Sequence, residues 1–186
     1  AFATGRSPKH SAIALTNGIL DLLSKHELKS VIAHELGHIK NRDTLITTIA
    51  ATIAGIIAYV ASMARWAAFF GGFGGRDRDN NGIIQLIVLA ILTPIIATIL
   101  QLAISRQREY LADMAAAKIT KDPWSLADSL EKIEEGIKIH PMGMGSEATS
   151  SLFISNPFKN QGFLNLFSTH PPVKERVKRL RKLKIR

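Results

Sequence analysis

The motif His-Glu-x-x-His lies in the first quarter of the chain, with His34, Glu35 and His38 at its fixed positions. On a helix, residues four apart lie on one face, one turn apart, so both imidazoles can reach one metal ion. Zinc accepts histidine nitrogens at about 2.0–2.1 Å, and a catalytic zinc site keeps one position open for water. A carboxylate beside that water can act as general base, which is the role predicted for Glu35. The alternative is a surface helix with two solvated histidines.

The residues around the motif favour a helix that packs on one side. Ser24 and Glu27 form the Ser-x-x-Glu pattern of a capping box, which predicts a helix from about Lys25 towards Asp43. Gly37 lies inside this helix, although glycine costs about 1 kcal/mol relative to alanine there. Its presence predicts the close approach of another part of the chain. The apolar side consists of Leu28, Val31, Ile32, Leu36 and Ile39.

Two uncharged segments follow the motif, at residues 44–64 and 83–105. Each is long enough to cross about 30 Å of hydrocarbon as a helix. A helix in the core of a soluble protein is rarely apolar on all sides over such a length. We therefore expect an inserted two-helix transmembrane hairpin in contact with membrane lipid. The alternative is a buried hairpin in a soluble protein.

This hairpin points to the remaining ligands of the metal. The chain has no cysteine, so an aspartate, a glutamate or a third histidine must complete the site. If the two segments are antiparallel, Glu109 returns to nearly the depth of His38. Asp113 then lies at the depth of His34 and can accept its second imidazole N–H, while Glu109 can be the third ligand. The alternative is a surface pair between Glu109 and Arg106, with Asp113 solvated.

The formal net charge of +9 is concentrated near the end of the chain, where eight of the 24 basic residues lie between Lys174 and Arg186. Aromatic residues are not interleaved with them as a base-stacking surface requires, so nucleic acid is not an expected partner. The basic residues that flank the two uncharged segments add to this excess. This positive excess lies on the side of the membrane opposite the connecting loop. The positive-inside rule predicts that this side is cytoplasmic.

Weaker signals outline the other elements. The alternation of small, apolar and polar residues in Ser11–Thr16 predicts a short strand, and Asn17-Gly18 predicts a turn after it. Within this strand, Ala12, Ile13 and Ala14 can bind an extended peptide by edge addition, or the strand can lie inside a small sheet. Further helices are expected to continue from 106 through 117, to begin at Asp122-Pro123, and to follow Pro172. For the last of these, packing on the domain is favoured over contact with anionic lipid. Residues 141–167 are expected to form a loop that covers the site.

Six stretches follow one another along nearly the whole chain in the order of a known family: AFATG at 1–5, AIALT at 12–16, the motif at 34–38, SRQREYLAD at 105–113, SLFISNP at 151–157 and LFSTHPP at 166–172. In these stretches the chain resembles the HtpX family of membrane-integrated zinc metallopeptidases, relatives of the eukaryotic CAAX prenyl proteases. The resemblance implies one Zn²⁺ per chain, held by His34, His38 and Glu109, with Glu35 as catalytic base.

The same resemblance implies hydrolysis of misfolded or regulated membrane proteins at the cytoplasmic face of the inner or plasma membrane, in stress response and protein quality control. Members of the family carry two further membrane helices upstream, so it also implies an N-terminally truncated, multi-pass chain. Related metallopeptidases place a histidine or arginine from a late segment at the oxyanion. His170 and Arg176 are therefore further catalytic candidates. The alternatives are a loop histidine without a catalytic role for His170 and a place in the solvated basic tail for Arg176.

The predicted fold is mainly α, a zincin-like metallopeptidase domain with a short strand near the N-terminus and the inserted hairpin. Residues 1–43 and 106–186 form the catalytic domain, and residues 44–105 form the hairpin. The expected function is that of a zinc-dependent endopeptidase acting on a protein or peptide substrate. A catalytically inactive zinc-binding membrane adaptor and a soluble secreted metalloprotease are the alternatives.

Overall fold

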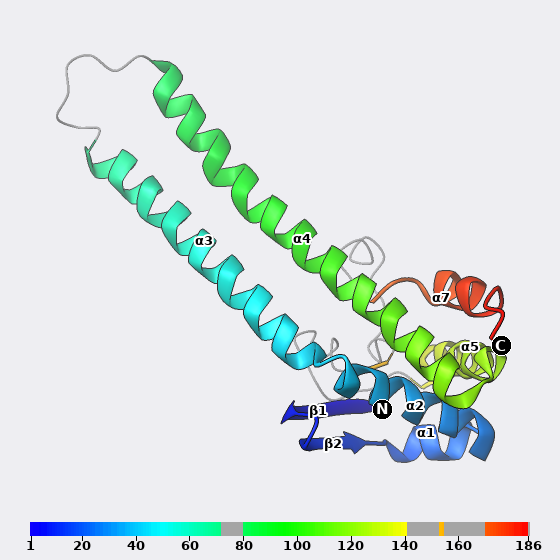
Figure 1. Cartoon of the computed structure of the whole chain (residues 1–186). Helices are drawn as coiled ribbons and strands as arrows, with labels where there is room; N and C mark the ends of the chain where they lie inside the picture. Colours follow the sequence, from blue (N-terminus) through cyan, green and yellow to red (C-terminus); the bar gives the residue numbers. More distant parts are fainter. Residues whose placement is uncertain (72–79, 141–152, 155–169, 186) are drawn as a thin grey trace. The chain divides into compact units, whose positions relative to one another are not determined.

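The computed structural model describes residues 1–71, 80–140, 153–154 and 170–185, and Figure 1 labels their helices and strands. The chain forms two compact units. One unit combines Ala1–Leu45 with Ile104–Arg186, and the other is Ile46–Ala103. The predicted boundaries, 43/44 and 105/106, lie within about two residues of these. The first unit is thus built from both ends of the chain, and it contains every candidate catalytic and metal-binding residue.

A two-stranded antiparallel sheet opens the first unit. It is formed by β1 (Phe2–Ser7) and β2 (His10–Ala14), with Phe2 opposite Ala14. The predicted short strand near the N-terminus is confirmed, although it ends at Ala14 because Thr16 caps the next helix. The pairing strand β1 was not predicted, because its alternation is interrupted by a Gly-Arg pair in the middle.

The residues after β2 form a helix where the sequence predicted a turn. Helix α1 runs from Asn17 to Leu22. The side chain of Thr16 caps it by accepting a hydrogen bond from the backbone N–H of Ile19, at 3.4 Å. Ile19 is buried in the core. The turn prediction was wrong because a cap and a buried isoleucine outweigh the turn preference of Asn-Gly.

Helix α2 (Lys25–Lys40) carries the His-Glu-x-x-His motif and begins at the predicted capping box. The hydroxyl of Ser24 accepts from the backbone N–H of Glu27, and the Glu27 carboxylate accepts from the backbone N–H of Ser24. The helix packs against α5 and β1. It ends at a sharp reversal, where Arg42 has a φ of +53° and the next helix begins one residue later.

Four further helices are described: α3 (Asp43–Gly71), α4 (Asn80–Thr120), α5 (Pro123–Ile139) and α7 (Val173–Leu180). α5 begins as predicted, with the carboxylate of Asp122 accepting from two backbone N–H groups of its first turn. α7 packs on α5, as expected for the last helix. The core of the first unit includes Val31, Ala116, Leu126, Leu130, Ile133, Val177 and Leu180.

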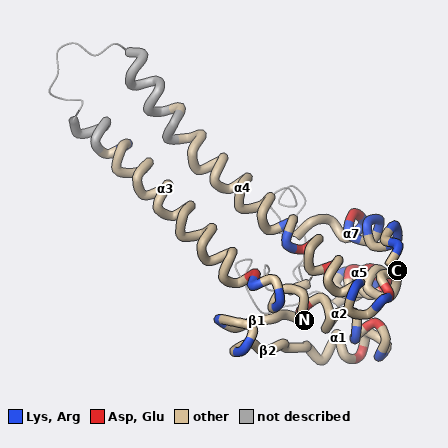
Figure 2. The backbone as a smooth tube through the Cα atoms, viewed as in Figure 1, with Lys and Arg blue, Asp and Glu red and all other residues tan. Residues whose placement is uncertain are grey.

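The second unit is apolar over its described length. The 24 residues Asp43–Trp66 of α3 have a mean hydropathy of 1.9, and none of the most apolar window is buried, so this helix is long and apolar enough to cross a membrane. Figure 2 shows the charged residues gathered on the elements of the first unit. The second predicted span, 83–105, lies within the single helix α4, but most side chains of 83–90 lie outside the described residues. The transmembrane hairpin therefore stays a prediction.

Candidate metal centre

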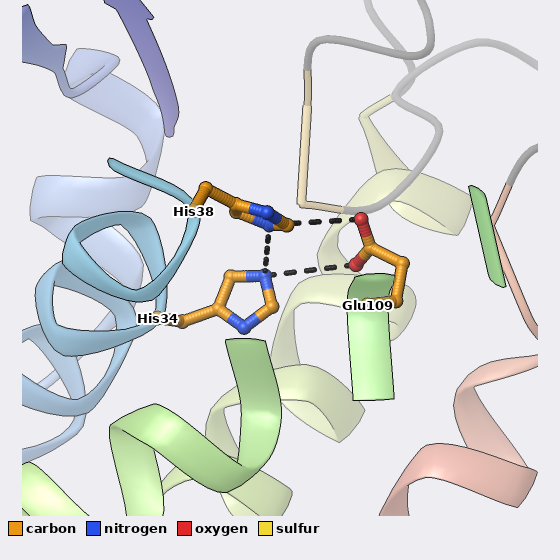
Figure 3. A group of neighbouring side chains, drawn as sticks. All are labelled: His34, His38 and Glu109. Atoms are coloured by element: carbon orange, nitrogen blue, oxygen red, sulfur yellow. Dashed lines mark hydrogen bonds and ion pairs between the residues drawn. The ribbon is translucent and has the colours of Figure 1, made fainter. Parts of the chain in front are cut away.

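Three side chains from two helices converge in the first unit (Figure 3). His34 and His38 come from adjacent turns of α2, and Glu109 comes from α4. The two Nε2 atoms lie 3.0 Å apart, and each lies 3.6 Å from one oxygen of the Glu109 carboxylate. Tetrahedral zinc with bonds of about 2.0–2.1 Å needs ligand atoms roughly 3.3 Å apart. The spacing of this cluster therefore fits one zinc-sized ion.

The two helices can meet this closely because of Gly37. A Cβ at this position would lie 3.1 Å from both the Cα and the carbonyl oxygen of Ala112, and 3.2 Å from the Cβ of Ala115. Such contacts are tighter than ordinary van der Waals distance, so a side chain here would push α4 away from α2. The close approach predicted for this glycine is confirmed, and it is what brings Glu109 to the two histidines.

The site is deeply buried and negatively charged. His34 is fully buried, and Glu35, Glu109 and Asp113 are each at most 5% exposed. These three carboxylates and the buried guanidinium of Arg176 leave a formal charge of −2, which a divalent cation would neutralise.

The titration of His34 reflects this negative charge. Burial lowers its pKa, but hydrogen bonding to the carboxylates of Asp113 and Glu109 outweighs burial and raises the pKa to about 9. Without a metal, the centre therefore attracts a proton to the same ring that a cation would use.

Glu35 lies in the same buried region but does not join the ligand cluster. Its Oε1 atom has no hydrogen-bond partner among the described residues, although the side chain is 3% exposed. Leaving a buried carboxylate oxygen unpaired costs about 1–3 kcal/mol or more, so a polar group or water is expected to meet it in the working protein. The general-base role of Glu35 stays a prediction.

Asp113 lies one helical turn after Glu109 on α4 and faces His34. Its Oδ1 is 3.0 Å from Nδ1 of His34, the ring nitrogen that points away from the other ligands. Burial raises the pKa of Asp113, but the charge of Arg176 and the hydrogen bond with His34 lower it below its usual value. A charged acceptor at this nitrogen favours the tautomer whose Nε2 can bind a metal.

Arg176 is almost completely buried and joins α7 to the centre. Its Nε and Nη2 donate to the two carboxylate oxygens of Asp113 at 2.9 and 2.7 Å. Its Nη1 donates to the carbonyl oxygen of Ile154 at 2.9 Å and lies 3.2 Å from Oε2 of Glu109. Burial raises the pKa of Glu109, but the charge of Arg176 outweighs it and holds this pKa well below its usual range. The sequence had left open a solvated place in the basic tail for this residue.

His170 reaches the centre from the segment before α7. Its Nδ1 lies 3.4 Å from Oε1 of Glu109, and its side chain is 11% exposed. The structure thus brings the ligand candidates together with Glu35, Asp113, His170 and Arg176. The loop expected to cover the site, 141–167, lies outside the described residues except for 153–154.

The predicted substrate strand is part of the sheet. Ala12, Ile13 and Ala14 lie in β2, and Ala12 is exposed while the other two are half-buried. One edge of β2 pairs with β1; within the described part of the chain, no strand pairs with the other edge. The strand thus lies in a small sheet and has an edge to which a peptide could add. Its role in binding a peptide stays a prediction.

Sequence reasoning missed Asp43. Its Oδ2 lies 2.6 Å from Nδ1 of His38, and its Oδ1 lies 3.2 Å from Nε of Arg108. The available signal was an acidic residue shortly after the motif helix, five positions beyond the second histidine. Asp43 was instead read as the end of that helix, because nothing in the sequence marks the reversal at Arg42.

Comparison with known proteins extends over almost the whole chain. The profile of peptidase family M48 matches residues 1–184. A protein described as a protease HtpX homolog from Thermococcus sibiricus is 54% identical over 185 residues, which cover 98% of this chain and 63% of that protein. Homologues of the same description from Syntrophotalea carbinolica and Aquifex aeolicus are 52% and 53% identical, covering 100% and 97% of this chain and 66% and 61% of their own lengths. No solved structure matches the chain.

The chain thus spans less than two thirds of the length of these curated relatives. The profile nevertheless includes the helix of the motif, the segment with Glu109 and Asp113, and the late segment with His170 and Arg176. The predicted resemblance to HtpX proteases is confirmed by the identity of about one half over this length. The chain belongs to peptidase family M48.

Proposed function

We propose that the chain is the catalytic part of a zinc-dependent endopeptidase that hydrolyses protein substrates at a membrane. The observation that carries this proposal is the cluster of His34, His38 and Glu109, whose ligand atoms lie within 4.8 Å of one another. Two imidazoles and one carboxylate form a ligand set typical of catalytic zinc, which leaves a fourth position for water or substrate. When bound, zinc supplies a Lewis acid and lowers the pKa of water towards neutrality.

Glu35 moves the proton in this mechanism. Its buried carboxylate takes a proton from the attacking water and delivers it to the nitrogen of the leaving amine. Because it is flanked in sequence by the two ligands but stands outside their cluster, it can serve as base without holding the metal.

His170 and Arg176 receive different roles. The guanidinium of Arg176 already donates to Asp113 and to Ile154, so it positions Asp113 and, through it, His34. His170 has a ring beside Glu109 and is slightly exposed. It is therefore the better placed donor for the negative charge that develops on the substrate carbonyl oxygen. Because of these contacts, we assign Arg176 a positioning role in place of the donor role that the resemblance implies for it.

The membrane assignment rests on the apolar helix at Asp43–Trp66. We propose that Ile46–Ala103 spans the membrane twice, that lipid surrounds it, and that the centre faces the cytoplasm. The proposed substrates are misfolded or regulated membrane proteins, taken up in an extended form along β2 in a role in protein quality control and stress response. The basic excess outside the connecting loop supports the orientation.

The substitution Glu35→Gln tests this function. The variant is expected to keep its zinc and to lose about 10²–10⁴-fold in the rate of cleavage of an unfolded substrate such as casein. Zinc content per chain and initial cleavage rate are measured on the same detergent-purified preparation.

Glu135→Gln is the matched control, because Glu135 is exposed on α5. It is expected to retain both zinc and activity. A wild-type chain that binds zinc but does not cleave would point instead to an inactive zinc-binding adaptor. Cleavage by Glu35→Gln at the wild-type rate would refute the proposed mechanism.

A further inference from the structure

We infer that Asp43 is a positioning residue for the metal ligand His38, and that Arg108 holds Asp43 in place. This inference rests on the proposed metal centre but not on proteolysis. It concerns a pair of residues outside the ligand cluster, both in the first unit.

The contact between Asp43 and His38 uses the ring nitrogen that the metal does not need. Nε2 of His38 faces His34 and Glu109, whereas Nδ1 lies 2.6 Å from Oδ2 of Asp43. A carboxylate at this distance accepts a hydrogen bond from the Nδ1–H of His38, which leaves the lone pair of Nε2 directed at the ion. The bond also fixes the rotation of the imidazole ring.

Asp43 is itself held on its other oxygen. Its Oδ1 lies 3.2 Å from Nε of Arg108, and the aspartate is 3% exposed. Arg108 directly precedes the candidate ligand Glu109 on α4, so the same turn of the helix positions both residues. The ion pair holds the carboxylate in the orientation that directs its other oxygen at His38.

The backbone around Asp43 explains how a residue beyond the motif helix returns to it. Arg42 takes a left-handed conformation with φ of +53°, which reverses the chain between α2 and α3. Asp43 is the first residue of α3, where the partial positive charge of a helix N-terminus stabilises a carboxylate. It belongs to the first unit, two residues before that unit ends at Leu45.

The same arrangement occurs at the other histidine. Nδ1 of His34 faces Asp113, and Asp113 is held by Arg176. Each imidazole therefore has its own carboxylate, and each carboxylate has its own arginine. The Asp43–Arg108 pair is the more exposed of the two, since 17% of the Arg108 side chain is accessible against 1% for Arg176.

Zinc affinity provides a test that does not depend on cleavage. Asp43→Ala, purified in detergent, is expected to bind zinc about 10–100-fold more weakly than wild type in competition with a chromogenic chelator. The visible spectrum of the Co²⁺-substituted protein is expected to change, because a freed imidazole alters the ligand geometry. Asp43→Asn keeps an uncharged acceptor and is expected to lose less affinity than Asp43→Ala.

Asp128→Ala is the matched control. Asp128 lies on α5 and is an exposed carboxylate that also pairs with an arginine, Arg181. It should leave both zinc affinity and the Co²⁺ spectrum unchanged. Arg108→Ala should weaken zinc binding in the wild-type background and have no further effect in the Asp43→Ala background, because it acts through Asp43.

The outcomes separate this inference from the proposed function. If the wild-type chain binds zinc and Asp43→Ala binds it within twofold of wild type, the positioning role is refuted while the metal centre stands. Circular dichroism shows whether Asp43→Ala folds. If it does not fold, the positioning role is refuted when Asp43→Asn and Arg108→Ala both keep the zinc affinity of wild type. If zinc binding weakens as expected but the wild type does not cleave, only the proposed proteolysis fails.

Discussion

Each histidine of the candidate centre divides its two ring nitrogens between two tasks. The Nε2 atoms of His34 and His38 face the shared ligand cluster, and the Nδ1 atoms face Asp113 and Asp43. This division favours, in each neutral ring, the tautomer whose Nε2 is free to bind an ion, and it fixes the orientation of both rings. A fixed orientation lowers the cost of ordering side chains when the ion binds.

At this scale, His170 and Arg176 should separate in their effects. His170→Ala is expected to lower kcat by about 10²–10³-fold with little change in KM, because a donor to the oxyanion acts mainly in the transition state. Its zinc affinity and unfolding midpoint should stay near wild type. Arg176→Met leaves Asp113 and Glu109 buried without their cation, and is expected to cost about 3–5 kcal/mol in the free energy of unfolding.

Denaturant unfolding followed by circular dichroism, together with steady-state kinetics, measures both effects. Arg181→Met is a suitable control, since Arg181 pairs with exposed carboxylates on α5 and its loss should cost about 1 kcal/mol or less. A change of less than threefold in kcat for His170→Ala would return His170 to a structural role. A stable Arg176→Met protein that has lost only kcat would instead make Arg176 the donor.

At the scale of elements, the centre depends on how closely α2 and α4 pack. α2 contributes the histidines and Glu35, and α4 contributes Glu109 and Asp113. Gly37 lies between the two histidines of α2, and Ala112 lies between the two acidic residues of α4. The contact of Gly37 with Ala112 therefore sets the distance across which the ligands meet.

Gly37→Ala should weaken this contact although alanine is the better helix former. The gain in helix propensity is about 1 kcal/mol, whereas overpacking in a tight contact costs about 1–3 kcal/mol. Backbone atoms at 3.1 Å cannot rotate away, so α4 must shift from α2. We expect a lower unfolding midpoint and weaker zinc binding, measured by thermal unfolding and chelator competition.

Gly55→Ala is the control for propensity alone. Gly55 lies in the interior of α3, and a Cβ there would meet nothing within 4 Å. This variant should be as stable as wild type or more stable, with unchanged zinc affinity. Equal behaviour of the two variants would show that the α2–α4 contact does not set the ligand spacing.

At the scale of the whole molecule, the two flanks of the apolar unit must lie in one compartment. His38 precedes Ile46–Ala103 and Glu109 follows it, yet their ligand atoms are 3.6 Å apart. A single membrane crossing by the helix at Asp43–Trp66 would place them on opposite sides. If that helix crosses, a return crossing must lie between residues 67 and 103.

Cysteine labelling tests this topology, because the chain contains no native cysteine. Lys40→Cys and Lys118→Cys are expected to react with an impermeant thiol reagent from the same side of sealed vesicles, since both positions are exposed in the first unit. Arg78→Cys, in the connection between the apolar segments, is expected to react from the other side. Detergent-permeabilised vesicles, in which all three should react, give the control. Labelling of positions 40 and 118 from opposite sides would rule out the assembled centre.

The sequence alone determined what depends on neighbouring residues. The capping box at Ser24 and Glu27 fixed the start of α2, and Asp122-Pro123 fixed the start of α5. The spacing of the motif placed both histidines on one face because the helical period is a local property. If the two long apolar segments form the predicted antiparallel hairpin, Glu109 returns to the level of the histidines, so this third candidate ligand could also be predicted from the sequence.

Only the tertiary structure decided which distant side chains meet. The pairing of β1 with β2, the contact of Asp43 with both His38 and Arg108, and the burial of Arg176 against Asp113 join residues that no local pattern connects. The resemblance made Arg176 a catalytic candidate, but the basic run by itself gives no sign that this residue is the one buried against Asp113. Its burial is stable only because α7 packs on α5 and places the guanidinium beside two buried carboxylates, whose charges offset the cost of removing it from water.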